Sequence, residues 1–284
     1  MDSAVRVGPA GWSYEDWKGI VYPEGTRAHP LAQLSALFDT VEVNASFYRP
    51  LTAQMTARWP EHVAANPRFR FTAKLWRRFT HEIDGEPDAA ALAGFLEGFA
   101  PLEERGLFGA LLVQFPWSFR RTVANRQYLA RLLELLGERR VVVEIRHASW
   151  NRPEVFEAMA ARGAAFCNID QPLFRDSLAP TENVTAPLAY VRLHGRNAED
   201  WFRESAGRDE RYDYLYSEEE LQPWVDKIAR MRATAAEVYV VTNNHFRGQA
   251  VVNALEIQKA LGRSVSAVPP SLLQHYPRLA RLLA

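Results

Sequence analysis

The sequence contains a single cysteine, Cys167, among its 284 residues. One cysteine cannot form an internal disulfide, and it excludes a metal site built from several cysteines. Because Cys167 lies in an apolar run, we expect it to be buried as a small hydrophobic side chain. An excess of charge is lacking as well, since Lys and Arg total 34 and Asp and Glu also total 34. This balance gives no support to a basic face that grips a long nucleic-acid duplex, although it leaves room for a local basic patch.

Long hydrophobic runs are also missing, since no stretch approaches the roughly 18 apolar residues of a membrane span. The first residues show no basic segment followed by an apolar stretch, so we expect no signal peptide, no membrane association and a cytoplasmic location. The sequence lacks a Gly-x-Ser-x-Gly elbow, a P-loop and a His-Glu-x-x-His motif. Covalent catalysis by serine or cysteine is therefore disfavoured.

Short apolar runs alternate with amphipathic helical patterns along the whole chain. Eight of these runs are nearly continuous in Val, Leu, Ile and Phe, which is typical of strands buried on both faces. The predicted strands are Val5–Gly11, Thr40–Phe47, Phe69–Trp76, Phe108–Phe115, Arg140–Arg146, Ala164–Asp170, Leu188–Gly195 and Glu237–Asn244. The pattern predicts one α/β domain over residues 1–284, a (β/α)₈ TIM barrel. An open doubly wound sheet is the weaker alternative, because no glycine-rich phosphate motif follows the first strand.

Two connections depart from the strand–helix alternation. Gln171–Pro187, after the sixth strand, is rich in Pro, Ser, Thr and Asn and predicts a loop that replaces the helix. Arg196–Tyr216 mixes charged and aromatic residues, which is compatible with a lid over the barrel mouth or with a solvated insertion.

Polar side chains recur near the carboxyl ends of the predicted strands. Successive strand residues point to opposite faces, so polar residues two apart share one face. We expect this set to converge at the mouth where barrel enzymes keep their chemistry: Glu42, Asn44, Lys74, Gln114, Glu144, Arg146, Asp170, Arg192, His194 and Asn244. Buried charges must pair with one another or meet a ligand, so the alternative is an ion network that satisfies itself.

The basic members of this set suit binding of an anion. Arg146 and Arg192 can make bidentate contacts with phosphate or carboxylate, and Lys74 adds a point charge. We expect Asn44, Asn244 and Gln114 to assist in binding the substrate.

The remaining members suit proton transfer. His194 can move a proton near neutral pH. Glu144 can orient a neighbouring basic group or act as a base, and Glu42 is the third catalytic candidate. Glu42 with Asp170 also forms a weak candidate site for a divalent metal ion, because carboxylate oxygens bind such ions. The seven histidines show no zinc-binding spacing.

Aromatic residues follow several predicted strands. The candidates for contact with substrate are Trp12, Tyr14 and Tyr48, with Phe47, Trp76, Trp117 and Trp150 at comparable positions. An aromatic rim can stack on bases or sugars, and it can equally cap the barrel. His81 and His147 follow the third and fifth strands, where a lone histidine is more often structural than catalytic.

Short segments along nearly the whole chain resemble the YecE-like family, also known as domain of unknown function number 72. They are Gly11-Trp12-Ser13-Tyr14, Trp17, Tyr22-Pro23, Val41–Tyr48, Lys74, Thr80-His81, Gln114-Phe115-Pro116, Glu144–His147, Ser149-Trp150, Arg192–Arg196, Asn243-Asn244-His245, Gly248, Ala250 and Tyr276-Pro277. The resemblance implies a TIM barrel and no settled activity. The chain departs from the family pattern at Pro9-Ala10 and at Trp117, which reshapes the rim without removing a charged candidate.

Three functions fit these residues. The leading hypothesis is a hydrolase-like enzyme acting on a small anionic, phosphate-bearing substrate such as a nucleotide, or on a nucleic acid. A carbohydrate-active enzyme with Glu42 and Glu144 as an acid/base pair is the second. A non-catalytic module that binds an anion or single-stranded nucleic acid is the third. The sequence assigns no cofactor beyond the candidate metal ion, and no oligomeric state.

Overall fold

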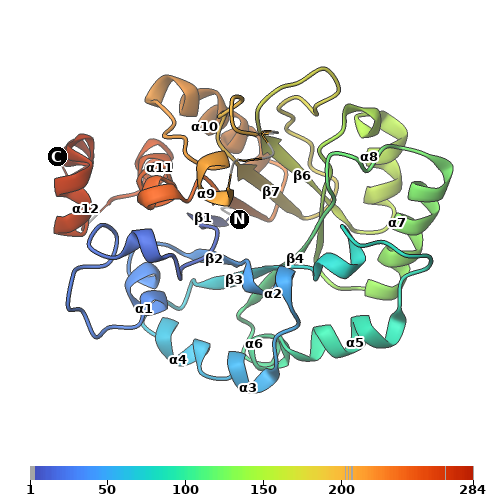
Figure 1. Cartoon of the computed structure of the whole chain (residues 1–284), viewed down its shortest axis with the longest axis horizontal. Coiled ribbons are helices and arrows are strands. Elements are labelled where there is room, and N and C mark those ends of the chain that lie inside the picture. Colours follow the sequence, from blue (N-terminus) through green and yellow to red (C-terminus); the bar gives the residue numbers. More distant parts are fainter. Residues whose placement is uncertain (1–3, 202, 204, 206, 266, 284) are drawn as a thin grey trace.

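Eight parallel strands form a single sheet in the order β1-β8-β7-β6-β5-β4-β3-β2 in the computed structural model, which describes residues 4–201, 203, 205, 207–265 and 267–283. Figure 1 shows the strands at the centre and helices around them. The strands are β1 (Ala4–Pro9), β2 (Thr40–Val43), β3 (Arg70–Lys74), β4 (Phe108–Gln114), β5 (Val141–Glu144), β6 (Ala165–Asp170), β7 (Leu188–Leu193) and β8 (Glu237–Thr242). All eight predicted strands are present.

The sheet nearly closes into a barrel between β1 and β2. The main contact at this seam is a parallel bridge between Ala10 and Glu42, in which the Gly11 amide donates to the Glu42 carbonyl at 2.8 Å. Gly8 permits the close approach, because a Cβ atom at this position would lie 1.9 Å from the Thr40 carbonyl oxygen. The architecture is therefore α/β and TIM-barrel-like, as the sequence predicts.

Amphipathic helices connect the strands and pack against them. Leu129, Leu132, Leu133 and Leu136 are buried on one face of α7 (Val123–Leu136), which begins at the Thr122 cap. The other helices are α1 (Pro30–Ser35), α2 (Ala45–Tyr48), α3 (Ala53–Thr56), α4 (Trp59–Val63), α5 (Ala89–Glu97), α6 (Ala100–Glu104), α8 (Pro153–Ala160), α9 (Arg208–Arg211), α10 (Glu218–Arg232), α11 (Gln249–Ala260) and α12 (Pro270–His275). In the part of the chain that is described, no helix has the length and apolar character needed to cross a bilayer.

The two unusual connections have different structures. Residues 171–187, between β6 and β7, are all described and contain neither helix nor strand. The segment 196–216, between β7 and α10, contains the short helix α9 and brings Trp201, Arg211 and Tyr212 to the barrel mouth.

Several strands end earlier than the sequence predicts. The predicted strand Thr40–Phe47 is wrong in its second half, because β2 ends at Val43 and α2 begins at Ala45. The Ser46 hydroxyl lies 3.0 Å from the Val43 carbonyl and 2.7 Å from the Lys74 carbonyl, so this side chain holds the turn against β3. Residues beyond such strand ends consequently form loops around the mouth.

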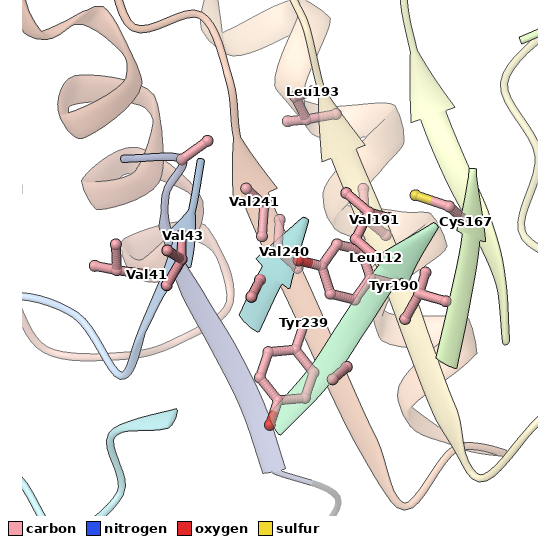
Figure 2. Packing of buried hydrophobic residues seen from close by; sticks show 14 of the residues in the cluster. Val41, Val43, Leu112, Cys167, Tyr190, Val191, Leu193, Tyr239, Val240 and Val241 are labelled. Atoms are coloured by element: carbon pink, nitrogen blue, oxygen red, sulfur yellow. The ribbon is translucent and has the colours of Figure 1, made fainter. Parts of the chain in front are cut away.

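Two tyrosines fill the interior of the barrel. Tyr190 on β7 and Tyr239 on β8 lie with ring centroids 5.9 Å apart, and Figure 2 shows both side chains between the strands, with Tyr239 below Tyr190 in this view. Cys167 is buried and unpaired, as expected. The Tyr190 hydroxyl donates to a Glu42 carboxylate oxygen at 3.0 Å, so the hydroxyl of Thr72, 2.8 Å away, is the donor to Tyr190. This chain of hydrogen bonds connects the apolar interior to the charged groups above it.

Candidate functional site

A buried network of charges lies above the tyrosines, and Arg192 on β7 is at its centre. One Arg192 nitrogen, Nη2, donates to Glu42 Oε1 at 2.7 Å, and Nη1 donates to Glu144 Oε2 at 2.5 Å. Both glutamates are fully buried, and Arg192 is 1% exposed. The guanidinium of β7 therefore bridges two strands that are not neighbours in the sheet, β2 and β5. We call Glu42, Glu144, Arg192 and His194 the buried network.

His194 completes the network as a neutral side chain. Its Nε2 atom lies 3.1 Å from Glu144 Oε1, and its Nδ1 atom lies 3.0 Å from the Asn243 amide nitrogen. A carboxylate accepts and an amide nitrogen donates, so Nε2 carries the proton and Nδ1 accepts. Burial, with Arg146 and Arg192 nearby, lowers the pKa of His194 to about 3 although Glu144 acts to raise it. Both ring nitrogens are thus engaged inside the protein.

Glu144 is held as a carboxylate by its neighbours. Burial alone would raise its pKa, but Arg192, His194 and Arg146 outweigh burial and hold that pKa well below the usual range. The Nε of Arg146 donates to Glu144 Oε1 at 3.0 Å. Glu42 and Glu144 therefore pair with Arg192 and Arg146, and the two negative charges balance the two positive charges. A further cation near this group has no carboxylate left to pair with.

Above the network lies a cavity of about 680 Å³, at the carboxyl ends of the strands. Aromatic side chains form much of its wall: Trp12, Tyr14, Phe47, Tyr48, Trp117, Trp201 and Tyr212. Its other side chains are Ser13, Asn44, Ala45, Lys74, Arg77, His81, Gln114, Pro116, Arg146, Arg211, Asn243 and His245, with the backbone of Gly11. The cavity has the size and mixed lining that are typical of small-molecule sites.

Four basic side chains line this cavity: Lys74, Arg77, Arg146 and Arg211. No carboxylate is among its described lining residues. Two of the arginines pair with acids that do not line the cavity: Glu82 Oε1 lies 2.8 Å from Arg77 Nε, and Glu144 Oε1 lies 3.0 Å from Arg146 Nε. The cavity is therefore electropositive on a chain whose net charge is zero.

Lys74, at the end of β3, has a strongly lowered pKa. Its Nζ atom donates to Gln114 Oε1 at 3.0 Å and lies 4.1 Å from the centre of the Phe47 ring. Burial, followed by the charge of Arg192, lowers the pKa of Lys74 to about 7. Burial and then Lys74 and Arg146 lower the pKa of His81 to about 4, which reflects the same positive surroundings.

The structure separates the predicted site residues into three groups. Those that line the cavity are Trp12, Tyr14, Asn44, Tyr48, Lys74, Gln114 and Arg146. Those beneath its floor form the buried network, so Glu42, Glu144, Arg192 and His194 do not line it. The third group, Asp170 and Asn244, faces the helices.

The expected orientation of Asp170 toward the barrel axis is wrong. Its carboxylate accepts from Trp224 Nε1 of α10 at 2.5 Å and from Arg196 Nη2 at 2.7 Å. Asn168, two residues earlier, has the same orientation and contacts Met231 of α10. Glu42 is bound to Arg192 and Tyr190 instead, so the two carboxylates proposed for a metal have separate partners. No group of three or more His, Cys, Asp or Glu among the described residues is arranged to hold a metal ion.

Asn244 is also placed differently from the prediction. Its amide nitrogen donates to Asn253 Oδ1 of α11 at 2.8 Å, so it faces the helix layer. The preceding residue, Asn243, shares the inward face of Tyr239 and lines the cavity. Extending the alternation from Tyr239 would have found Asn243.

Other cavity residues are harder to identify from the sequence. His245 lines the cavity and is in the segment that resembles the family, but it lies beyond the end of β8, where strand alternation does not apply. Arg77 follows β3, and Trp201, Arg211 and Tyr212 come from the long segment after β7. The alternation of side chains within strands does not predict the path of a loop of this length.

Comparison with known proteins identifies close likeness over almost the whole chain. UPF0759 protein YunF of Bacillus subtilis (strain 168) is 27% identical over 287 residues, covering 95% of this chain and 99% of that protein. A crystal structure of a DUF72 family protein from Thermotoga maritima MSB8 is 35% identical with a TM-score of 0.81, and covers 92% of this chain and 100% of that one. One from Enterococcus faecalis V583 is 26% identical with a TM-score of 0.81, and covers 94% and 98% respectively.

The family described as Protein of unknown function DUF72 matches residues 6–278. This range includes every strand from β2 to β8, most of β1 and all the cavity residues. The family description and these relatives assign no activity or substrate. The chain belongs to the DUF72 family, as the motifs around the barrel mouth indicate.

Proposed function

We propose that this protein is an enzyme that binds a phosphate-bearing substrate in the cavity and hydrolyses a phosphoester, with nucleotides as the first candidates. The observation that carries the proposal is the lining of the cavity, which has four cations and no described carboxylate. Arginine and lysine in a partly desolvated site bind phosphate oxygens through charge-assisted hydrogen bonds.

Arg146 is the best placed of the cations to bind a phosphate. Its Nε is already bonded to Glu144, which fixes the guanidinium, and its Cζ atom lies 5.3 Å from the centre of the Trp201 ring. The side chain is 12% exposed and lines the cavity. An arginine restrained on two sides loses little conformational entropy when an anion binds.

The aromatic wall supports a substrate that carries a ring. Tyr48 is 56% exposed at the rim, and Trp12 packs edge-on against Trp59 with centroids 5.1 Å apart. Exposed faces of this kind stack on a base or on the apolar face of a sugar. A phosphate among the cations and a ring against the wall together describe a nucleotide or a sugar phosphate.

The positions of the polar groups suggest a role for each of them in the reaction. Lys74 faces the cavity and, with a pKa near 7, can accept a proton from an attacking water. Arg146 and Arg77 would offset the negative charge that develops in the transition state. Glu42, Glu144, Arg192 and His194 would act as positioning residues beneath them. The prediction that His194, Glu144 and Glu42 themselves transfer the proton remains untested.

The test combines binding and turnover. Inorganic phosphate, nucleoside mono- and triphosphates, sugar phosphates and short oligonucleotides would be titrated against tryptophan fluorescence, and phosphate release would be followed with and without divalent metals. We expect Arg146→Gln to weaken phosphate binding about tenfold to a hundredfold. The matched control is Arg230→Gln, because Arg230 pairs with Glu182 on the outside of α10.

Each other outcome has a defined meaning. Binding without release of phosphate from any compound would leave an anion-binding module. Turnover of glycosides, abolished in Glu144→Gln, would favour the carbohydrate hypothesis, which needs glutamates that lie beneath the cavity floor here. No binding of any phosphate compound, or equal binding by the Arg146 variant, would refute the proposal.

A further inference from the structure

Lysine is scarce in this chain, and one of the few lysines is in the cavity. The 34 basic residues include only four lysines: Lys18, Lys74, Lys227 and Lys259. Lys18 Nζ is 2.8 Å from Glu15 Oε1, Lys227 Nζ is 3.9 Å from Glu182 Oε2, and Lys259 Nζ donates to the Leu282 carbonyl at 3.2 Å. Arginine provides nearly all other positive charge, so an amine at position 74 offers chemistry that the surrounding guanidiniums cannot.

The Lys74 amine has different surroundings from the amines of Lys18 and Lys227, which form ion pairs. Among the described residues no carboxylate oxygen lies within 4.0 Å of its Nζ atom, because Glu42 and Glu144 are bound to arginines. Its contacts are the Gln114 side-chain oxygen and the face of Phe47. The amine is thus fixed in position by one hydrogen bond and opens on the cavity without a counter-ion.

We propose that Lys74 Nζ is a nucleophile that forms a Schiff base with an aldehyde or ketone carbon of a phosphate-bearing substrate. The inference rests on the anion-binding part of the proposed function and not on phosphoester hydrolysis. It names a second chemical feature of the substrate, a carbonyl group within reach of Lys74 when phosphate lies on the arginines.

A neutral amine is required for this step, and the site supplies it. With a pKa lowered by burial to about 7, about three quarters of Lys74 is neutral at pH 7.5, whereas about one in a thousand of an ordinary lysine is. Desolvation beside other cations is a recognised way to activate a lysine.

The reaction balances without any other reactant. The nitrogen lone pair attacks the carbonyl carbon, the C=O π electrons move to oxygen, and a proton passes from nitrogen to that oxygen to give a carbinolamine. Loss of the hydroxyl group with one proton, as water, then forms the C=N bond. Protonation of the imine restores a positive charge at position 74, and the bound phosphate offsets that charge.

The experiment uses pyridoxal 5′-phosphate as the probe, since it combines a ring, a phosphate and an aldehyde. The protein is incubated with the probe, the imine is reduced with borohydride, and the labelled peptide is identified by mass spectrometry. We expect Lys74 to be labelled on the order of a hundredfold faster than Lys18, Lys227 or Lys259. Its labelling should reach half its maximum near pH 7.

Two variants make the result specific. Lys74→Arg removes the nucleophilic amine and places a permanently charged guanidinium there, so it should lose the label. Inorganic phosphate binding measured on the same variant shows whether its anion site is still formed. Lys227→Arg, on the outer helix α10, should be labelled at Lys74 like the wild type. Far-ultraviolet circular dichroism checks that each variant is folded, and Lys74→Met replaces the arginine variant if that one does not fold.

The outcomes separate this inference from the proposed function. Pyridoxal without phosphate should label Lys74 at least tenfold more slowly; equal labelling supports the nucleophile and counts against the phosphate site. Phosphate binding with no label on Lys74 overturns the Schiff base alone. Label distributed over the other three lysines, or unchanged in Lys74→Arg, also overturns it.

Discussion

The buried network and the cavity above it use the same residue types in opposite ways. In the network Arg192 meets two carboxylates, His194 is neutral, and the side chains are almost fully enclosed. In the cavity four cations have no acid among the described lining residues. The network is electrostatically complete, whereas the cavity carries positive charge that a ligand can satisfy. We therefore expect the lower layer to stabilise the barrel and, under the proposed function, the upper layer to meet the substrate.

The largest expected effect is on the network. Arg192→Met leaves Glu42 and Glu144 buried without their shared cation, and we expect it to lower the free energy of unfolding by about 3–5 kcal/mol. Urea denaturation measures the change. Arg140→Met is the control, because Arg140 pairs with Glu237 while half exposed, and its loss should amount to less than about 1 kcal/mol. Equal effects would show that the network is not a special source of stability.

The next effect concerns the uncompensated amine of Lys74. Its pKa is lowered from 10.5 to about 7 in the folded protein, so between these values the unfolded chain binds more protons and stability rises with pH. Lys74→Met should therefore be more stable than the wild type near pH 6, by several kcal/mol, and the gap should close above pH 10. Urea titrations at several pH values measure it. A gap that does not change with pH would contradict a lowered pKa.

A smaller effect on stability is expected where the two layers meet, at Arg146. In Arg146→Gln the Glu144 carboxylate keeps Arg192 and His194, so we expect a loss of about 1–2 kcal/mol, well below that of Arg192→Met. Phosphate binding should show the reverse order of sensitivity among folded variants. If Arg146→Gln were as destabilising as Arg192→Met, Arg146 would belong to the closed layer.

The smallest effect is the pH response of His194. Its folded pKa of about 3 is below the ordinary 6.5, so the unfolded chain binds more protons between these values and stability falls as the pH drops through them. We expect His194→Gln to remove most of that loss between pH 6 and pH 4. Thermal unfolding at pH 4, 5, 6 and 7 follows the difference. A His194 NMR titration near pH 6.5 would instead show an exposed, functional imidazole.

The fold and part of the site were predictable because side chains alternate regularly between the two faces of a strand. The alternation within β5 and β7 correctly brought Glu144 and Arg192 together, since inward residues at the same level of a barrel must meet. The alternation did not predict how deep in the barrel each polar side chain lies. Whether a polar residue lines the cavity or lies beneath it depends on the stagger of neighbouring strands.

Other errors arise where the local pattern is ambiguous. On β6 the polar Asn168 and Asp170 bond outward to α10, which alternation alone cannot distinguish from an inward pair. Trp201 and Tyr212 reach the cavity through a long connection whose path depends on tertiary contacts. Composition identified this connection as a lid or an insertion without placing its side chains.

The pairing of β1 with β8 also has a consequence for how the protein folds. The pairing of β1 with β8 joins Ala4 to Glu237, and the Arg6–Glu237 hydrogen bond spans 231 positions of sequence. During synthesis β1 must wait without its ladder partner until β8 has left the ribosome, and an unpaired strand edge invites aggregation. Barrel closure is therefore expected late in folding, with slow kinetics set by these distant contacts. On the other side of β1, Gly8→Ala is expected to hinder closure against β2, since the added Cβ would lie 1.9 Å from the Thr40 carbonyl oxygen.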